Sequence, residues 1–344
     1  MHFQALSIGI QVPTHHFNGT VHSVFHQACN MRLESQVLLT LLPFEKDNVP
    51  HGIRLNTFSQ PIFQDLIRVG QSVSCRGGIL RIGGSDFSVD LRTARPWHIE
   101  LKGLHIDLRR PAQASSWAAA WAELKTSQRK CDLSKILEVV SSPKEQSDTP
   151  VAMEFLPQLS THLVTALLRA TRTFQLEDAR AAIRSLIGLG LGLTPSGDDF
   201  LVGYLAGLWS TAGSGPIRAQ FLSALDSELS ETAQNTNEIS RAYLRSAAKG
   251  QFSEPIAKLA QQLKHANNMS GVRAATQAAL QVGHTSGTAG VLGLLLGCLV
   301  WQSPASHLVF NDLFMRLFSS IDPSAMKCGQ KDEESDEDDA RRPS

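Results

Sequence analysis

A glycine-rich stretch runs Gly188-Leu-Gly-Leu-Gly-Leu-Thr-Pro-Ser-Gly-Asp-Asp-Phe-Leu-Val-Gly-Tyr-Leu-Ala-Gly207, and a second, Gly283-His-Thr-Ser-Gly-Thr-Ala-Gly-Val-Leu-Gly-Leu-Leu-Leu-Gly297, repeats its frame. Both contain Ser-Gly, five residues, Gly, three residues and Gly, at a constant offset of 90 residues. Each copy predicts a loop that leads into an apolar helix, because Ser or Thr precedes the apolar run and Pro195 stands near the first helical position. Two similar helices therefore organise the second half of the chain.

The glycines inside these two predicted helices indicate how the helices pack. Gly203 and Gly207 lie four residues apart on one helix face, as do Gly293 and Gly297 on the other helix. A glycine inside a helix costs up to about 1 kcal/mol relative to alanine, so four of them need a compensating contact. We expect a close approach of the two backbones, which would also bring the two Ser-Gly starts together.

The two predicted helix starts form a candidate site for a small anion. The first turn of a helix carries unpaired N–H groups and a partial positive charge, which attract anions and polarised carbonyl oxygens. Asp198, Asp199 and His284 are the candidate catalytic residues, because carboxylates and imidazole transfer protons. The candidate substrate- or anion-binding residues surround them: Gly190, Gly192, Thr194, Ser196, Gly197, Thr285, Ser286 and Gly287.

A structural interpretation of the same residues is also open. Thr194 would then cap its helix, the two aspartates would complement the helix dipole, and His284 would only pack in its loop. A polar helix start at residues 235–241 could line the same cleft, although capping explains it equally well.

The sequence pattern changes along the chain and predicts an α+β protein. Residues 1–110 hold short alternating segments, typical of a small β-barrel or sandwich, with a hairpin turn at 83–86. Residues 111–154 combine a helical segment with linker composition. Residues 155–322 carry roughly eight helices, which predicts an all-α domain around the glycine-rich pair. Residues 323–344 form an acidic tail that we expect to be disordered.

The composition is that of an ordinary soluble globular protein, with 42% hydrophobic residues, 19% charged residues and a formal net charge of zero. This balance gives no argument for nucleic-acid binding. The most apolar run, 287–301, is shorter than the roughly 18–20 residues that a membrane span needs, so we expect no membrane partner. The five cysteines form no CxxC pair and no secretory signal opens the chain, which predicts reduced thiols and a cytoplasmic location.

Several familiar motifs are excluded by their spacing. A dinucleotide-binding loop needs G-x-G-x-x-G after a strand, whereas the first segment has G-x-G-x-G after a predicted helix. Neither segment contains the Gly-Lys-Ser/Thr of an NTPase phosphate loop, and neither Ser196 nor Ser286 lies in a Gly-x-Ser-x-Gly elbow. The histidines near the N-terminus have no cysteine or acid to complete a zinc site. We therefore predict no cofactor and no metal.

The chain resembles the AllH family over roughly residues 5–320. The beginnings of the two glycine-rich segments quoted above carry this resemblance, and Gly19-Thr-Val-His-Ser-Val-Phe25 is a weaker third mark. Two positions depart from the family pattern: Leu191 stands where proline is frequent, and Ala289 stands where aspartate is frequent. The second departure weakens any mechanism that needs another carboxylate beside Gly287.

The resemblance implies one subunit of oxamate carbamoyltransferase, acting in allantoin degradation, a part of purine catabolism. That enzyme converts oxalurate and phosphate into oxamate and carbamoyl phosphate, and it requires AllF-type and AllG-type subunits as partners. The resemblance assigns no catalytic residue, so the candidate residues rest on the chemistry of the motifs. A different class stays open, namely a non-catalytic subunit that binds a small anion or serves as a scaffold.

Overall fold

The computed structural model describes residues 1–344 except 57–62, 130, 132, 134–154, 266–267 and 303–344. The contacts within the chain divide it into two compact units. The first comprises Met1–Ile99 together with Gln251–Glu254, and the second comprises Glu100–Gly250 together with Pro255–Ser344. The predicted acidic tail at 323–344 lies outside the described residues.

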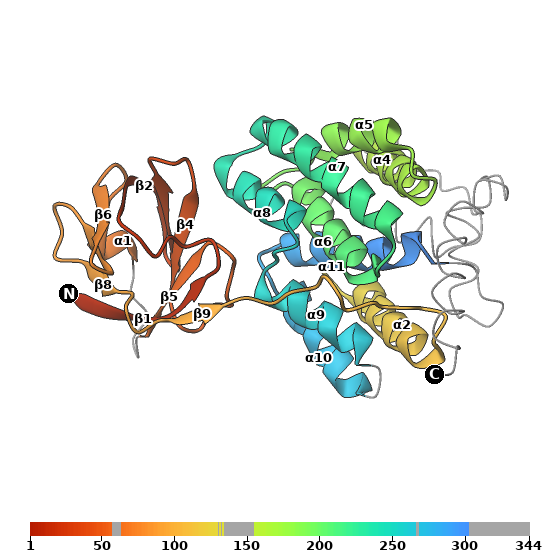
Figure 1. The fold of residues 1–344 in the computed structure, drawn as a ribbon, viewed down its shortest axis with the longest axis horizontal. Helices are drawn as coiled ribbons and strands as arrows, with labels where there is room; N and C mark the ends of the chain where they lie inside the picture. The colour runs from red at the N-terminus through yellow and green to blue at the C-terminus, as the bar shows by residue number, and fades with distance from the viewer. Residues whose placement is uncertain (57–62, 130, 132, 134–154, 266–267, 303–344) are drawn as a thin grey trace, which may run out of the picture. The chain divides into compact units, whose positions relative to one another are not determined.

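The first unit is a β-barrel, and the α+β class predicted from the sequence is confirmed. Its strands pair in the order β5-β4-β3-β2-β6-β7-β8-β1, and β1 also pairs antiparallel with β5, which closes the ring of strands (Figure 1). Strand β9 adds in parallel to the far end of β1. The strands are β1 His2–Gly9, β2 Phe17–Phe25, β3 Ala28–Leu33, β4 Leu38–Leu42, β5 Gly52–Asn56, β6 Ser72–Arg76, β7 Ile79–Ile82, β8 Ser88–Asp90 and β9 Arg95–Trp97.

The barrel forms where apolar side chains alternate or run together. Every residue of β4 is buried, and the hairpin turn predicted at 83–86 joins the antiparallel pair β7 and β8. Strands β3 and β6 were not predicted, although apolar and polar residues alternate in both. In β6 only Val73 and Cys75 point into the core. The short helix α1 (Phe63–Leu66) contributes the fully buried ring of Phe63 to the same core.

One short segment of the later chain belongs to the barrel unit. Glu254 accepts two hydrogen bonds through Oε2, from the backbone N–H of Asn48 at 2.9 Å and from its side-chain Nδ2 at 2.6 Å. The Glu254 N–H donates in return to the Asn48 carbonyl at 2.9 Å. The Gln251 side chain also accepts a hydrogen bond from Gln11. Segment 251–254 therefore completes polar groups of the barrel that lie about two hundred residues earlier in the chain.

The second unit is helical, with α6 and α11 at its centre. In Figure 1, α4, α5, α7 and α8 lie on one side of this pair and α2, α9 and α10 lie on the other. The helices are α2 Pro111–Thr126, α4 Phe155–Arg172, α5 Leu176–Leu186, α6 Ser196–Thr211, α7 Pro216–Thr232, α8 Glu238–Ala248, α9 Glu254–Lys264, α10 Met269–Leu280 and α11 Ser286–Val300, with a 3₁₀ turn η2 at Ala233–Asn235.

Glycines bring the backbones of α6 and α11 into contact. A Cβ atom placed on any of the four predicted glycines would lie within 2.4 Å of a carbonyl oxygen of the other helix, closer than a real Cβ atom can approach. Only glycine fits at these positions. The four contacts, from Cβ to oxygen, are Gly203 to Gly290 at 1.9 Å, Gly293 to Phe200 at 2.1 Å, Gly207 to Leu294 at 2.4 Å and Gly297 to Tyr204 at 2.3 Å.

These contacts are reciprocal. Gly203 meets the carbonyl of Gly290, and Gly293, 90 residues after Gly203, meets the carbonyl of Phe200, 90 residues before Gly290. The two helices thus pack side by side in the same direction, like the two halves of a symmetric dimer within one chain. Both Ser-Gly starts consequently lie at the same end of the pair.

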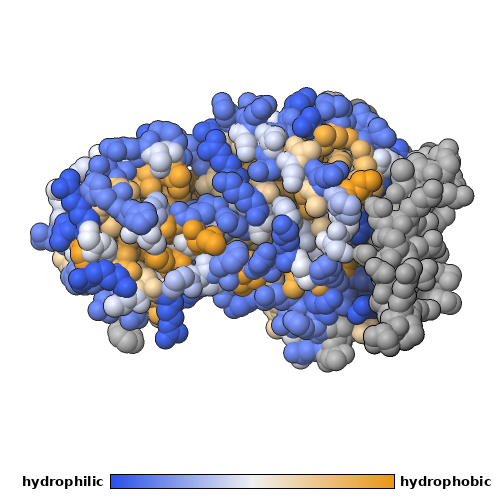
Figure 2. Space-filling view, viewed as in Figure 1, coloured by the Kyte–Doolittle hydropathy of each residue, from blue (hydrophilic) through white to orange (hydrophobic). Residues whose placement is uncertain are grey.

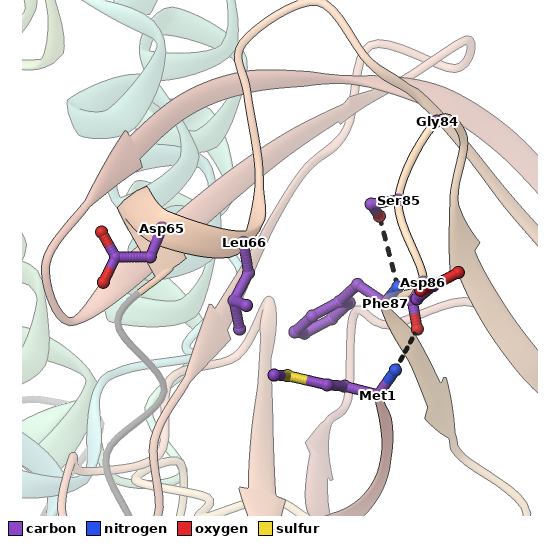
Figure 3. Close-up of a pocket in the computed structure, with 7 residues that line it drawn as sticks. All are labelled: Met1, Asp65, Leu66, Gly84, Ser85, Asp86 and Phe87. Carbon is purple, nitrogen blue, oxygen red and sulfur yellow. Dashed lines mark hydrogen bonds between the residues drawn. The ribbon is translucent and has the colours of Figure 1, made fainter.

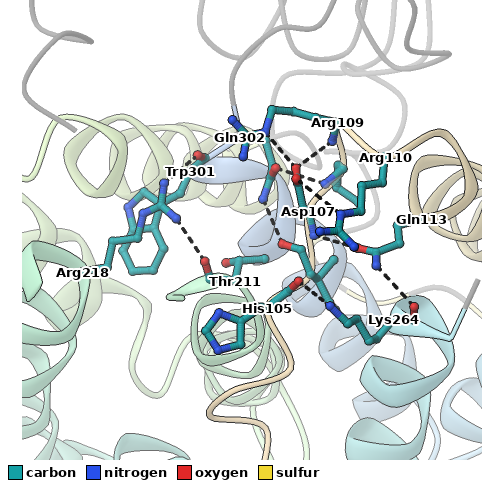
Figure 4. Close-up of polar contacts among 12 residues, drawn as sticks. His105, Asp107, Arg109, Arg110, Gln113, Thr211, Arg218, Lys264, Trp301 and Gln302 are labelled. Carbon is teal, nitrogen blue, oxygen red and sulfur yellow. Dashed lines mark hydrogen bonds and ion pairs between the residues drawn. The ribbon is translucent and has the colours of Figure 1, made fainter. Parts of the chain in front are cut away.

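Arginines cap the opposite end of this helix pair. Arg218 donates to the Thr211 carbonyl at the end of α6 (3.2 Å) and to the Trp301 carbonyl just after α11 (3.3 Å), as Figure 4 shows. Arg172 donates to the carbonyl of Val300 at 2.8 Å, and burial lowers the pKa of its guanidinium to about 10. Cations stabilise helix C-termini, where the carbonyl groups carry partial negative charge. These arginines therefore hold the ends of α6 and α11.

The chain enters the helical unit along this same end. The Ile106 N–H donates to the Ser210 carbonyl at 2.8 Å, the Leu108 N–H donates to the Gln302 side chain at 3.1 Å, and Lys264 donates to the His105 carbonyl at 2.9 Å (Figure 4). These contacts tie the segment before α2 to the helix core.

Helix α11 is buried throughout from Gly287 to Val300, as predicted for the most apolar run. Hydrophilic side chains cover most of the face seen in Figure 2, and the apolar ones form smaller groups there. None of the described helices combines the length and the apolar character that crossing a membrane requires.

Candidate functional site

The two glycine-rich segments meet at the starts of α6 and α11. Helix α6 begins at Ser196 and α11 begins at Ser286, which are equivalent positions of the repeat. The Thr194 hydroxyl lies 2.7 Å from the Ser286 hydroxyl and donates to Oδ2 of Asp199 at 3.0 Å. Three predicted site residues from both segments thus form one hydrogen-bonded group.

The Asp199 carboxyl is the titratable centre of this group. Burial, with a smaller contribution from the charge of Asp198, raises the pKa of Asp199 to about 7, although hydrogen bonds from the hydroxyls of Ser286 and Thr194 oppose the rise. A carboxyl with a pKa near 7 gives and takes protons at neutral pH, which is what general acid–base catalysis requires.

Asp198 has a different environment from its neighbour. Its side chain is 1% exposed and accepts hydrogen bonds from the Gly188 N–H at 2.8 Å and from the Thr236 hydroxyl at 2.5 Å. Burial raises the pKa of Asp198, and these hydrogen bonds oppose the rise. Asp198 therefore ties the loop before α6 to the residues before α8. The sequence could not separate the roles of the two aspartates, and the contacts do.

The polar segment 235–241 does both things that its sequence allowed. Asn237 caps α8 by accepting from the N–H groups of Ile239 and Ser240, each at 3.0 Å. It also donates to the Leu193 carbonyl at 2.9 Å, so the same side chain holds the loop of the first segment. This segment therefore contacts the first glycine-rich segment through two side chains, that of the cap residue Asn237 and that of Thr236.

Tyr243 is a site residue that the sequence reading missed. Burial is the main cause that raises the pKa of its phenol to about 12, and the charge of Asp199 also contributes to the rise. Tyr243 lies on α8, and nothing in the sequence spacing links α8 to α6. The one available signal was the polar start of α8.

The N–H groups of Gly197 and Gly287 do not play the predicted part. The Gly197 N–H donates to the Leu189 carbonyl at 2.8 Å, and the Gly287 N–H donates to the Val282 carbonyl at 2.9 Å. Both groups are occupied by the loops that precede the helices, so neither is available to an anion in this conformation. The physical reason is that each loop turns back and closes on the first turn of its own helix.

Close packing explains why these two positions are glycine. A Cβ atom on Gly197 would lie 2.0 Å from the Leu186 carbonyl oxygen, and one on Gly287 would lie 2.3 Å from the Ala279 carbonyl oxygen. In the loop before α6, Gly190 and Gly192 both have φ of +110°, which other residues rarely adopt. These glycines shape the site through the backbone.

The remaining predicted residues line the two helix starts in different ways. Ser196 is buried, with 1% of its surface exposed, whereas His284 is exposed and forms no hydrogen bond within the described part of the chain. Thr285 is the N-cap residue of α11, and Pro195 is the N-cap residue of α6. Thr194 is therefore not the helix cap that the structural interpretation required.

Arg129 is a second residue that the sequence reading missed. Its guanidinium donates to the carbonyl of Gly283 at 2.7 Å, and its own carbonyl accepts from the Thr288 hydroxyl at 3.1 Å. It follows α2 and is separated from the second segment by more than 150 residues. Only the folded chain brings this cation beside the start of α11.

A surface hollow occurs elsewhere, in the barrel unit. It is lined by Met1, Asp65, Leu66, Gly84, Ser85, Asp86 and Phe87 (Figure 3). None of the residues predicted from the glycine-rich segments lines it. Among the described residues, its acidic side chains, Asp65 and Asp86, form no group of hydrogen bonds comparable to the one around Asp199. The starts of α6 and α11 are therefore the stronger candidate site.

Known protein families match both units of the chain. A family model described as oxamate carbamoyltransferase subunit AllH matches residues 186–298, which contain both helix starts, and a model described as the AllH family N-terminal domain matches residues 4–96. The chain belongs to the AllH family. AllH proteins are named as carbamoyltransferase subunits, which implies partner subunits in a complex. No solved structure matches the chain.

Proposed function

We propose that this chain supplies the reacting site of an oxamate carbamoyltransferase, at the paired starts of α6 and α11. The reaction is the conversion of oxalurate and phosphate into oxamate and carbamoyl phosphate, within allantoin degradation, in a cytoplasmic complex with AllF-type and AllG-type subunits. The observation that carries the proposal is the group of Thr194, Ser286 and Asp199, which joins both glycine-rich segments around a carboxyl of raised pKa.

The reaction needs one proton to move between two reactants. A phosphate oxygen attacks the ureido carbonyl of oxalurate, the bond from that carbonyl carbon to the oxamate nitrogen breaks, and the nitrogen leaves with a proton. Hydrogen phosphate brings a proton that carbamoyl phosphate no longer needs. A carboxyl with a pKa near 7 is suited to take the proton from hydrogen phosphate and to give a proton to the leaving nitrogen.

The proposed roles follow the contacts of each residue. Asp199 transfers the proton, Thr194 orients its carboxyl, and Ser286 donates to the developing negative charge of the carbonyl oxygen. Asp198 holds the loop of the first segment in place. The further binding candidates are partly or fully exposed residues of the two loops, namely Gly190, Gly192, Thr285 and His284, with His284 available as a second proton donor.

The test is carbamoyl phosphate formation by the complex reconstituted from this chain and its partner subunits. Asp199→Asn keeps the size of the side chain and removes its proton transfer, so turnover should fall at least about 100-fold, the usual scale for an acid–base group. Asp178→Asn, at an exposed carboxyl on α5, is the matched control and should leave turnover unchanged. Near-normal turnover of the Asp199 variant would remove this carboxyl from the mechanism.

The same assay separates catalysis from mere anion binding. If the partner subunits form carbamoyl phosphate at full rate without this chain, the chain is a binding or scaffolding subunit. Calorimetry of the chain with oxalurate, oxamate and phosphate then measures which of these anions it holds.

A further inference from the structure

The segment that follows α2 is fastened to the start of α11 by two contacts. The carbonyl of Arg129 accepts from the Thr288 hydroxyl at 3.1 Å, and the guanidinium of Arg129 donates to the Gly283 carbonyl at 2.7 Å. Thr288 is 1% exposed, so the backbone contact is an internal one, whereas Arg129 is half-buried and its guanidinium lies at the rim. The buried Thr288 hydroxyl holds the backbone of Arg129, and the guanidinium of Arg129 faces the second glycine-rich loop.

The position of Gly283 brings this guanidinium to the group around Asp199. A Cβ atom on Gly283 would lie 3.1 Å from the Ser286 hydroxyl oxygen, so the residue whose carbonyl holds Arg129 is in contact with Ser286. Ser286 in turn lies 2.7 Å from Thr194, which donates to Asp199. Arg129 is thus bound to the loop residue that lies beside Ser286, one of the hydroxyls that the proposed reaction uses.

Arg129 differs from other arginines of the helical unit in how its donors are used. Arg184 holds Glu228 with two hydrogen bonds, and Arg241 donates to three carbonyls around η2. A guanidinium has five N–H donors. Within the described residues, the guanidinium of Arg129 makes a single hydrogen bond and no ion pair.

We propose that Arg129 binds an oxyanion of the reactants, either the carboxylate of the oxalurate and oxamate or the phosphate, and places it beside Ser286. The proposal rests on the proposed function. A guanidinium presents parallel N–H groups that match two oxygens of a carboxylate or phosphate, and such charge-assisted pairs are stronger than neutral hydrogen bonds. The reactants are all anions. The group around Asp199 contains no cationic side chain, and the guanidinium of Arg129 supplies one at the rim of the two helix starts.

The experiment measures KM and kcat of the reconstituted complex for oxalurate at saturating phosphate, and for phosphate at saturating oxalurate. Arg129→Gln should raise one of the two KM values about 10- to 100-fold, on the scale of a lost charge-assisted hydrogen bond, with kcat within about 3-fold of the wild type. The reactant whose KM rises is the one that Arg129 binds. Arg129→Lys keeps the charge without the paired geometry and should recover part of the loss.

Thr288→Val is the matched control, because it removes the other contact of the same segment and leaves the guanidinium in place. It should leave both KM values near those of the wild type. Unchanged KM values in Arg129→Gln, a fall in kcat alone, or an equal rise in the Thr288 variant would overturn the proposal, the last because it would reduce Arg129 to holding a loop.

Failure of the proposed function gives a different result. If the wild-type complex has activity that Asp199→Asn does not reduce, the proposed chemistry fails, while the KM values of the Arg129 variants still report on anion binding. If the complex has no activity, calorimetry of the full chain with oxamate and with phosphate replaces the KM values. Equal affinity of wild type and Arg129→Gln for both anions would then overturn the proposal.

Discussion

Two neighbouring aspartates in the first turn of α6, Asp198 and Asp199, have different roles in this protein. Asp198 is enclosed, with backbone and hydroxyl donors on both of its oxygens. Asp199, one residue later, points to the other segment and has a pKa raised to about 7 by burial. A helix advances 100° per residue, so adjacent side chains face different neighbours. At the scale of single residues, the sequence motif identifies the two acids, and the elements packed around each acid determine its hydrogen bonds and its pKa.

The raised pKa of Asp199 predicts how stability changes with pH. The folded state keeps a proton on this carboxyl that the unfolded chain loses near pH 4, so the contribution to stability is fully present below pH 4 and is lost as the pH rises through about 7. Asparagine has no such proton. Asp199→Asn should therefore melt at a higher temperature than the wild type at pH 8, and the difference should shrink towards pH 5.

Thermal unfolding followed from pH 5 to 8.5 measures this difference. Asp178→Asn, on the exposed surface of α5, is the control and should follow the wild type at every pH. A melting-temperature difference that is the same at all pH values would show that the carboxyl of Asp199 keeps an ordinary pKa.

The site residues also show what a sequence can reveal at this scale. Thr194, Asp199 and Ser286 stand out because each lies in a repeated, glycine-rich frame. Tyr243 and Arg129 have no such frame, and they reach the site from α8 and from the end of α2 through tertiary packing. The roles of the Gly197 and Gly287 N–H groups were predicted incorrectly, because a helix start suggests free donors and cannot show that its own loop turns back to accept from them.

At the scale of elements, the glycine contacts between α6 and α11 make one substitution much more harmful than its neighbour. A Cβ atom on Gly293 would lie 2.1 Å from the Phe200 carbonyl oxygen, and backbone cannot move aside locally. Gly293→Ala should lower the free energy of unfolding by about 1–3 kcal/mol or more, the scale of overpacking.

Gly290→Ala is the matched control in the same buried helix. There a Cβ atom would meet the tip of the Ile256 side chain at 3.3 Å, which a small rotation relieves, and alanine favours the helix by about 0.5–1 kcal/mol. This variant should be near neutral. Urea unfolding of both proteins makes the comparison, and similar losses for the two would contradict a backbone contact specific to Gly293.

Most elements could be predicted because their pattern is local. The nine longer helices of the described chain follow apolar spacing and start near Pro, Ser, Thr or Asn, and the glycine frame identified the central pair. Strands β3 and β6 were not recognised, although apolar residues alternate with Asn30 and Arg32 in the first and with the serines in the second. Their strand form comes from pairing with β2 on both of its edges, which is a long-range property.

At the scale of the whole molecule, the barrel unit depends on a residue from the helical part of the sequence. Asn48 is buried, and Glu254 accepts from both its backbone N–H and its side chain. Glu254→Ala leaves these donors unsatisfied, so the free energy of unfolding of the barrel should fall by about 1–3 kcal/mol. Hydrogen exchange should become faster in β4 and β5 and stay unchanged in α11.

Glu231→Ala, at an exposed position of α7, is the control for this prediction and should alter neither region. Faster exchange confined to α11 in the Glu254 variant would mean that the segment 251–254 supports the helices alone.

The pairing of Asn48 with Glu254, 206 residues further along the chain, has a consequence for biosynthesis. A nascent polypeptide leaves the ribosome from its amino end, so every strand of the barrel emerges well before the acid that completes it. During that interval the backbone N–H and the side-chain Nδ2 of Asn48 lack the acceptor that Glu254 provides in the folded protein. A clone truncated after residue 99 would reproduce that unfinished intermediate and would be a poor substitute for the barrel of the full-length chain.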